Sequence, residues 1–338
     1  MLSAPGPRGV VDEKAAMDIV KGWKAELQLK QDEFCTVLGK NDPSSQSQMP
    51  PLCERLVLSN KSYTSAAAKH IADFITSASL SSQVTSIDLS DIIASREESE
   101  GLSVLRTFSD AFQSSTKLVD IDLSDNAMGS KGISSSVSIL TLRSLEKLSL
   151  CNNGLSESSM NEVADILLQS ETCKRLKKIH FYNNMSGDGG CEAFVRILNH
   201  CGSNLVDIRF SRTRAQRQGS LKVAEAIRDL ITERECNIEH LDLADNSFST
   251  AGADVLSSSL HLCTRLKYLD VRDCLLEDDG NEQICRAISG FCPLDYFDMS
   301  GNDITRDDAQ DIMLLLQKTP SLKTFRVQEN ELSSIGIK

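Results

Sequence analysis

The sequence is short of aromatic residues and of positive charge. Only 5% of its 338 residues are aromatic, and a single tryptophan, Trp23, is present. The core must therefore be mainly aliphatic, which a content of 40% hydrophobic residues makes possible. The formal net charge of −12 argues against binding to a nucleic-acid backbone, which needs clustered Lys and Arg. It suits a basic protein partner.

The sequence also lacks a membrane segment, a secretion signal and a local metal motif. Its first residues, MLSAPGPRGVVDEKAA, contain no apolar signal region, and no uninterrupted apolar run approaches the ~18 residues of a membrane helix. The eleven cysteines include no C-x-x-C pair, whereas zinc sites need closely spaced ligand pairs. We therefore expect reduced, buried thiols, no metal site and a cytoplasmic location, diffuse or perinuclear.

The pattern L-x-x-L-x-L-x-x-N recurs along the chain. Weaker copies end at Thr213 and Cys274, and two earlier ones lie at 55–61 and 84–92. The last four copies end at an even 28-residue step, at positions 246, 274, 302 and 330. Such copies resemble leucine-rich repeats of the longer, helix-containing type, and about ten are present. The clear copies are LVDIDLSDN (118–126), LEKLSLCNN (145–153), LKKIHFYNN (176–184), IEHLDLADN (238–246), LDYFDMSGN (294–302) and LKTFRVQEN (322–330).

Each position of the repeat has a physical reason. The L-x-L segment is a short strand whose apolar residues point inward, and the final Asn satisfies backbone groups buried between coils. Apolar spacing near 3–4 predicts helices after the turns, for example at 251–262 and 307–317. The expected fold is an α/β leucine-rich repeat solenoid, a ribonuclease-inhibitor-like horseshoe with its parallel sheet inside and its helices outside.

This expectation divides the chain in two. Residues 52–338 should form one continuous repeat domain, because a single unit cannot bury its core alone. Residues 1–51 are an N-terminal extension with an amphipathic helix at 12–34 and a linker, NDPSSQSQMPP, at 41–51.

Two rows of polar residues should face solvent on the inner surface. Five of the nine residues between the strand hydrophobics are Asp, and adjacent carboxylates repel. A partner with Lys or Arg would offset this repulsion, and the row is equally compatible with a solvated acidic surface. Its members are Asp88, Asp122, Ser149, His180, Arg209, Asp242, Asp270, Asp298 and Arg326. The row at the rim, just before the Asn position, contains Asp91, Asp125, Asn152, Asn183, Arg212, Asp245, Asp273 and Glu329.

No set of catalytic residues stands out. The sequence has no G-x-x-x-x-G-K-[ST], H-E-x-x-H or G-x-S-x-G motif, and its five histidines lie in different repeats. Only His180 occupies an outward position between strand hydrophobics, where a lone His is usually an ordinary surface residue. One repeat is long, with 34 residues from Ile92 to Asn126. We expect this loop to place Arg96 on the same rim as Asn152, with about 10 Å between their strands.

Several segments outside the repeat consensus carry a more specific resemblance. IDLSDIIASREESEGLSVLRTFSDAF, DIDLSDNAMGSKGI, LSLCNNGLSE, HFYNNMSGDGG and MSGNDIT resemble the Ran GTPase-activating proteins, with the plant branch most similar. The similarity spans roughly residues 52–335. The resemblance does not extend to the first 51 residues, which lack that branch's Trp-Pro-Pro domain, or to the family's acidic C-terminal tail.

The resemblance implies a function and a set of residues. Members of this family bind the GTP form of Ran, a small GTPase, and stimulate its GTP hydrolysis without an active site of their own. It implies a monomer that needs no cofactor, since GTP and Mg belong to the partner. Asn152 would help to position the GTPase's own glutamine, and Arg96 is the family's loop arginine. The residues expected to contact Ran are Asp91, Asp125, Asn183, Asp88 and Asp122.

A second interpretation stays open at this point. The same fold and acidic surface fit a non-catalytic leucine-rich repeat scaffold or inhibitor that binds a basic protein. It does not explain the long Arg96 loop. The two adjacent asparagines separate the roles: Asn153→Ala should lower stability, whereas Asn152→Ala should melt almost like the parent.

Overall fold

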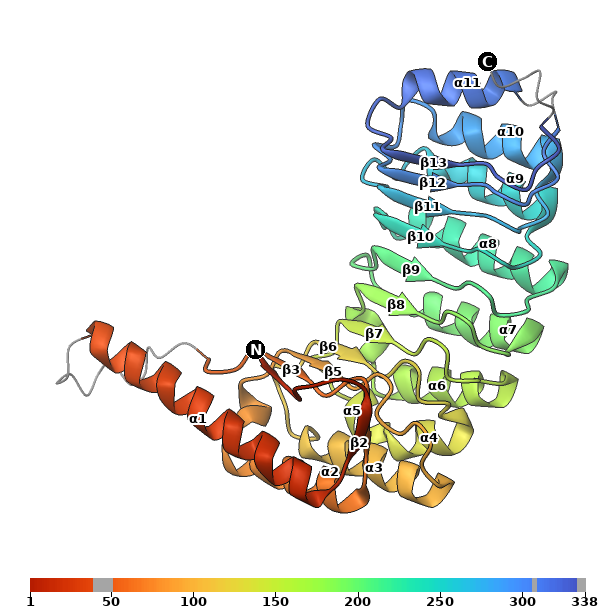
Figure 1. Ribbon diagram of the computed structural model, residues 1–338. Helices are drawn as coiled ribbons and strands as arrows, with labels where there is room; N and C mark the ends of the chain where they lie inside the picture. Colours follow the sequence, from red (N-terminus) through yellow and green to blue (C-terminus); the bar gives the residue numbers. More distant parts are fainter. Residues whose placement is uncertain (39–50, 306–308, 333–338) are drawn as a thin grey trace. The chain divides into compact units, whose positions relative to one another are not determined.

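The computed structural model describes residues 1–38, 51–305 and 309–332, and most of it consists of coils made of a short strand, a turn and a helix (Figure 1). The chain forms two compact units. The first comprises Met1–Asn126 and Lys131–Leu148, and the second comprises Ala127–Ser130 and Ser149–Lys338. The predicted α/β leucine-rich repeat solenoid is confirmed by these coils.

The first unit contains two parallel sheets. Strands β1, β3, β5 and β6 follow one another in that order, and β2 pairs with β4. The strands are β1 (Leu2–Ser3), β2 (Gly9–Val11), β3 (Arg55–Val57), β4 (Lys61–Tyr63), β5 (Ser86–Asp88) and β6 (Asp120–Asp122). The helices are α1 (Glu13–Leu38), α2 (Ser65–Ser77), the 3₁₀-helix η2 (Leu80–Ser82), α3 (Glu98–Ala111) and α5 (Val137–Leu140). The division between the units falls within α4 (Gly129–Ser135) and β7 (Lys147–Ser149).

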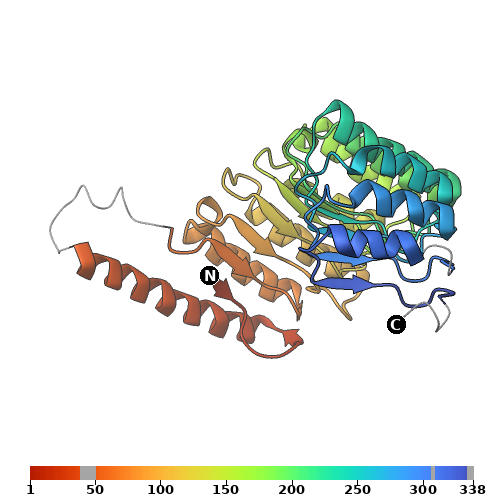
Figure 2. The same ribbon diagram turned by 90° about the horizontal axis from the view of Figure 1, so that it is seen from above.

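The second unit repeats one arrangement six times. Its strands β8 to β13 follow the order of the sequence in parallel, and helices α7 to α11 lie along one side of them (Figures 1 and 2). The strands are β8 (Lys178–His180), β9 (Asp207–Arg209), β10 (His240–Asp242), β11 (Tyr268–Asp270), β12 (Tyr296–Asp298) and β13 (Thr324–Arg326). The helices are α6 (Glu157–Gln169), the 3₁₀-helix η3 (Thr172–Arg175), α7 (Gly187–Leu198), α8 (Arg217–Glu233), α9 (Ser249–Leu260), α10 (Glu277–Ile288) and α11 (Ala309–Lys318).

The repeat's leucine positions form the core, as the pattern predicts. Around β8, Leu176, Ile179 and Phe181 are fully buried. Phe rings fill some positions: Phe194 of α7 stacks on Phe210 after β9, with centroids 4.3 Å apart and an interplanar angle of 7°. Burial of these side chains between strands and helices holds successive coils together.

The final Asn of the repeat is a buried bridge between coils. Asn302 is fully buried, and its Nδ2 donates to Val271 O in the preceding coil at 2.9 Å and to Met299 O at 3.0 Å. Its Oδ1 accepts from Cys274 N at 2.9 Å. At the weaker copy, the Cys274 thiol donates to Leu243 O at 3.5 Å, which reproduces part of this bonding. The predicted role of the Asn ladder is confirmed.

The N-terminal helix predicted at 12–34 is confirmed as α1. Trp23 is 3% exposed, lies 6.2 Å from the Phe74 ring of α2, and donates its indole N–H to Ser3 O at 2.8 Å. Because β1 also pairs with β3, the first residues extend the parallel sheet by one strand. The domain boundary at residue 51 stays a prediction, and the linker at 41–51 lies almost wholly outside the described residues.

Two further expectations concern cysteines and membranes. Of the cysteines whose side chains the structure describes, ten are free thiols; nine of these are buried, and Cys151 is half-buried. None of the described helices has both the length and the apolar character needed to cross a bilayer.

Candidate functional site

The rim row shares a backbone conformation that the sequence analysis did not anticipate. In coil after coil its residue has a positive φ, between 51° and 62°, and lies in the left-handed helical region. Asn and Asp tolerate this region better than other non-glycine residues. The members are Asp91, Asp125, Asn152, Asn183, Arg212, Asp245, Asp273 and Glu329, and Gly301 with φ +65° takes the same position.

The backbone N–H of most rim residues donates to a carbonyl of the next coil. Asn152 N donates to Tyr182 O at 2.7 Å, Asn183 N donates to Ser211 O at 2.9 Å, and Asp273 N donates to Ser300 O at 2.9 Å. The turn therefore accounts for the polar residue type at this row without any partner. Positive φ is a sufficient structural reason for an Asn or Asp.

The two adjacent asparagines point in opposite senses, as predicted. Asn153 is fully buried in the ladder, whereas Asn152 is exposed with φ 52°. Asn152 Oδ1 accepts a hydrogen bond of 2.8 Å from Asn183 Nδ2, so two of the predicted site residues are in contact. Because alanine is strained at positive φ, the expectation that Asn152→Ala would melt like the parent needs correction: a loss of stability should accompany it.

Arg96 lies in the first unit and contacts both its own coil and the preceding one. Its Nε donates to Ser62 Oγ at 2.9 Å, and its Nη1 lies 3.4 Å from Glu100 Oε2. Its side chain is 16% exposed. Glu100 Oε1 also accepts from Ser65 N at 3.1 Å, at the start of α2. Arg96 thus ties the loop before α3 to the start of α2. Its expected proximity to Asn152 stays a prediction.

The remaining predicted contact residues also make local hydrogen bonds. Asp88 accepts from Ser90 N at 3.0 Å, and Asp122 accepts from Ser124 N at 2.9 Å. This bond to the amide two residues ahead closes the turns after β5 and β6. Asp91 forms an ion pair of 2.8 Å with Arg8. Asp125 shares the rim conformation with φ 62°.

The inner acidic row is not a solvated surface in the second unit. Asp242, Asp270 and Asp298 are each 2% exposed or less. Arginines of the same chain offset their charge: Arg209 Nε lies 2.6 Å from Asp242 Oδ2, and Arg326 Nη1 lies 3.9 Å from Asp298 Oδ2. The need for a basic partner to neutralise this part of the row is therefore reduced.

In this row, the pKa of Asp270 is raised above its ordinary value. Burial, and then the neighbouring charge of Asp242, raise the pKa of Asp270 to about 7, while Arg272 at 3.7 Å acts in the opposite direction. Asp270 also accepts from Arg272 N at 3.2 Å. A carboxyl group with a pKa near neutrality here reflects its burial first, and then the charges of the neighbouring aspartates on adjacent strands.

A cluster of two histidines and an aspartate was missed by the sequence analysis. His180 Nε2 lies 2.7 Å from Asp207 Oδ1, and His240 Nδ1 lies 3.1 Å from the same oxygen. The three residues come from β8, β9 and β10. Aligning outward-facing strand positions across neighbouring repeats would have revealed the cluster, because no local motif contains it.

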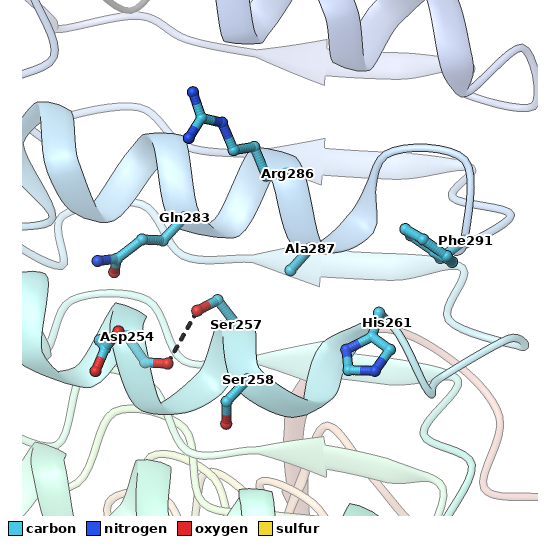
Figure 3. Close-up of a pocket in the computed structure, with 8 residues that line it drawn as sticks. All are labelled: Asp254, Ser257, Ser258, His261, Gln283, Arg286, Ala287 and Phe291. Carbon is cyan, nitrogen blue, oxygen red and sulfur yellow. Dashed lines mark hydrogen bonds between the residues drawn. The ribbon is translucent and has the colours of Figure 1, made fainter.

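An open recess lies on the helical side, between α9 and α10 (Figure 3). Arg286 points away from it and pairs with Asp311 at 3.1 Å. Within the recess, His261 contacts the Phe291 ring edge-on at 6.0 Å. Its geometry brings no nucleophile and base together among these residues, so it is a surface depression. The lining residues are Asp254, Ser257, Ser258, His261, Gln283, Arg286, Ala287 and Phe291.

Comparison with known proteins identifies the repeats. A family model described as Leucine Rich repeat matches residues 114–135 and 235–257. The chain is 42% identical over 97 residues to RAN GTPase-activating protein 1 of Arabidopsis thaliana, which covers 28% of this chain and 18% of that protein. It is 26% identical over 227 residues to NACHT, LRR and PYD domains-containing protein 3 of Macaca mulatta, covering 66% and 18%.

Among solved structures, an internalin from Listeria monocytogenes aligns with 83% of this chain and 62% of its own, at 15% identity and a TM-score of 0.46. The alignments with the Arabidopsis thaliana and Macaca mulatta proteins each span less than a fifth of the length of those relatives. Together with the observed coils, the matched repeats make it a leucine-rich repeat protein.

Proposed function

We propose that this chain is a GTPase-activating protein that binds a Ran-type small GTPase in its GTP form and stimulates GTP hydrolysis. The observation that carries the proposal is the 42% identity to a RAN GTPase-activating protein over 97 residues. It is supported by the non-consensus segments around Arg96 and Asn152.

The chemistry assigned to Asn152 suits a neutral amide. GTP hydrolysis by such partners depends on positioning and charge stabilisation, and the GTPase's own glutamine orients the attacking water. An amide can hold that glutamine by donating and accepting hydrogen bonds, whereas a carboxylate would repel the nucleotide's negative charge. Asn152 is exposed at the end of its strand and contacts Asn183, which makes both candidates for partner contact.

The first test separates the Asn152 side chain from its backbone conformation. Glycine tolerates φ 52°, so Asn152→Gly removes the amide while keeping the turn. We expect single-turnover stimulation of Ran GTP hydrolysis to fall by about 10²-fold. Asn152→Asp should be as defective, because it adds negative charge.

Asp273→Gly is the matched control, since Asp273 is an exposed member of the same row with φ 51°. It should retain full stimulation, with a melting temperature close to that of Asn152→Gly. Full activity of Asn152→Gly would remove Asn152 from the site. No stimulation by the unmodified chain, with binding to a basic protein instead, would favour the scaffold interpretation.

The second test concerns Arg96. Its guanidinium is bonded to Ser62 and faces Glu100, so we expect it to shape the loop before α3 rather than to reach the phosphates. Arg96→Ala should raise the concentration needed for half-maximal stimulation and leave the maximal rate close to normal. Arg106→Ala, which removes an exposed arginine of α3, is the control. A reduced maximal rate with unchanged affinity would instead indicate direct participation in the reaction.

A further inference from the structure

The cluster formed by His180, Asp207 and His240 presents three metal-binding atoms to one point. The two imidazole nitrogens lie 2.7 and 3.1 Å from Asp207 Oδ1, and all three atoms lie within 4.8 Å of one another. From these positions we propose that the strand surface of β8, β9 and β10 is a binding site for a zinc ion, a property independent of the proposed function.

The distances suit a small divalent cation. Zinc bonds to imidazole nitrogen and carboxylate oxygen are about 2.0–2.2 Å long, which places tetrahedral ligand atoms about 3.3 Å apart. The observed separations from Asp207 Oδ1 are slightly shorter, so these two distances need only lengthen by a few tenths of an ångström around an ion. Calcium and magnesium are disfavoured, because they prefer shells of oxygen ligands.

The pairing of β8, β9 and β10 places the three ligand residues next to one another without an ion. Asp207 and His240 are direct partners in the parallel pairing of β9 and β10. In the pairing of β8 with β9, Lys178 of β8 lies opposite Asp207 of β9, and His180 lies two residues further along β8. Strands in a sheet are about 4.8 Å apart, so outward side chains on three neighbouring strands converge with little loss of freedom.

Aromatic stacking holds one ligand ring in place. The His240 ring stacks on Tyr268 with centroids 4.1 Å apart and an interplanar angle of 10°. Tyr268 in turn stacks on Tyr296 at 4.4 Å and 2°. This stacking restricts the orientation of the His240 ring.

The cluster is accessible but partly sheltered. The side chains of His180, Asp207 and His240 are 15%, 28% and 32% exposed, so an ion can enter from solvent and keep a water as its fourth ligand. The nearby Arg209 is held elsewhere, at 2.6 Å from Asp242 and 3.9 Å above the Tyr182 ring. Lys178, whose charge acts on His180, is a neighbouring positive charge that opposes binding.

The test uses the chain alone, without any GTPase, so its outcome is separable from that of the proposed function. Chelator-treated protein is titrated with Co²⁺ and followed by visible absorption, and Zn²⁺ is then added as a competitor. We expect one equivalent of Co²⁺ to give the absorption of a tetrahedral or five-coordinate site, and Zn²⁺ to displace it.

Variants locate the ion. His180→Ala and His240→Ala should each weaken binding by more than about 100-fold, and Asp207→Asn should weaken it as well. His200→Ala, which removes an exposed imidazole elsewhere, should bind normally. Lys178→Ala should tighten binding, because a nearby positive charge is removed. Circular dichroism checks that each variant is folded.

Two results would overturn the proposal. Co²⁺ spectra that do not change on titration would show that the three side chains form only a hydrogen-bonded cluster. Equal metal affinity of the parent and a folded His180→Ala/His240→Ala variant would place the bound ion elsewhere.

Discussion

At the scale of single residues, backbone conformation and hydrogen bonding determine which polar residues the repeat contains. Asn302 is buried and bridges two coils, while Asp273 at the rim is exposed with positive φ. The same two roles fall to the neighbours Asn153 and Asn152. A polar residue in a repeat therefore needs a structural explanation before a functional one, and Asn152 has both.

The ladder can be tested by comparing two positions of different burial. Asn302→Ala should lower the free energy of unfolding by about 2–3 kcal/mol, because buried carbonyls and N–H groups lose their partners. Asn330 makes equivalent bonds, with Nδ2 donating to Met299 O at 3.1 Å, but it is only half-buried. Asn330→Ala should cost clearly less, since water can replace the amide. Equal losses in denaturant unfolding would contradict this explanation.

At the scale of elements, neighbouring strands bring identical residue types into contact. The register pairs Asp242 with Asp270, and Asp270 with Asp298. Tyr268 and Tyr296 stack in the same way. The repeat therefore brings like charges together in the same way as it brings aromatic rings together. Arg209, Arg272 and Arg326 offset the charges of the buried aspartates only in part.

This crowding predicts a pH dependence of stability. The folded-state pKa of Asp270 is about 7, above its ordinary value of 3.8, so between these values the folded chain holds a proton that the unfolded chain releases. The contribution of Asp270 to stability is therefore full below about pH 4 and is lost as pH rises through 7. Asp270→Asn keeps the oxygen that accepts from Arg272 N and cannot ionise.

We expect Asp270→Asn to be more stable than the parent at pH 8, by on the order of 2 kcal/mol, and similar to it near pH 4. Chemical unfolding of both proteins at several pH values measures the difference. A parallel pH dependence of the two proteins would show that Asp270 is not the titrating group.

At the scale of the whole molecule, the chain is a series of coils that forms two units, and Arg96 and Asn152 belong to different ones. Each residue is therefore tested by its own variant and control. The zinc ligands all belong to the second unit, whose strands β8 to β13 pair in sequence order. The N-terminal segment adds β1 to the first unit's sheet and packs Trp23 between Ser3 and Phe74.

The sequence alone determined the repeat. Leucines at fixed spacing predict strands, the final Asn predicts the ladder, and the inward and outward senses of Asn153 and Asn152 follow from the same spacing. These features are local, because each depends on a few residues within one coil.

Only the tertiary structure showed which residues of neighbouring coils contact one another. Four findings depend on contacts between different repeats, which no single repeat shows. They are the positive φ of the rim, the hydrogen bond of Arg96 to Ser62, the burial of Asp270, and the convergence of His180 with Asp207 and His240. Sequence spacing between repeats varies, so only the register of neighbouring strands shows which side chains meet.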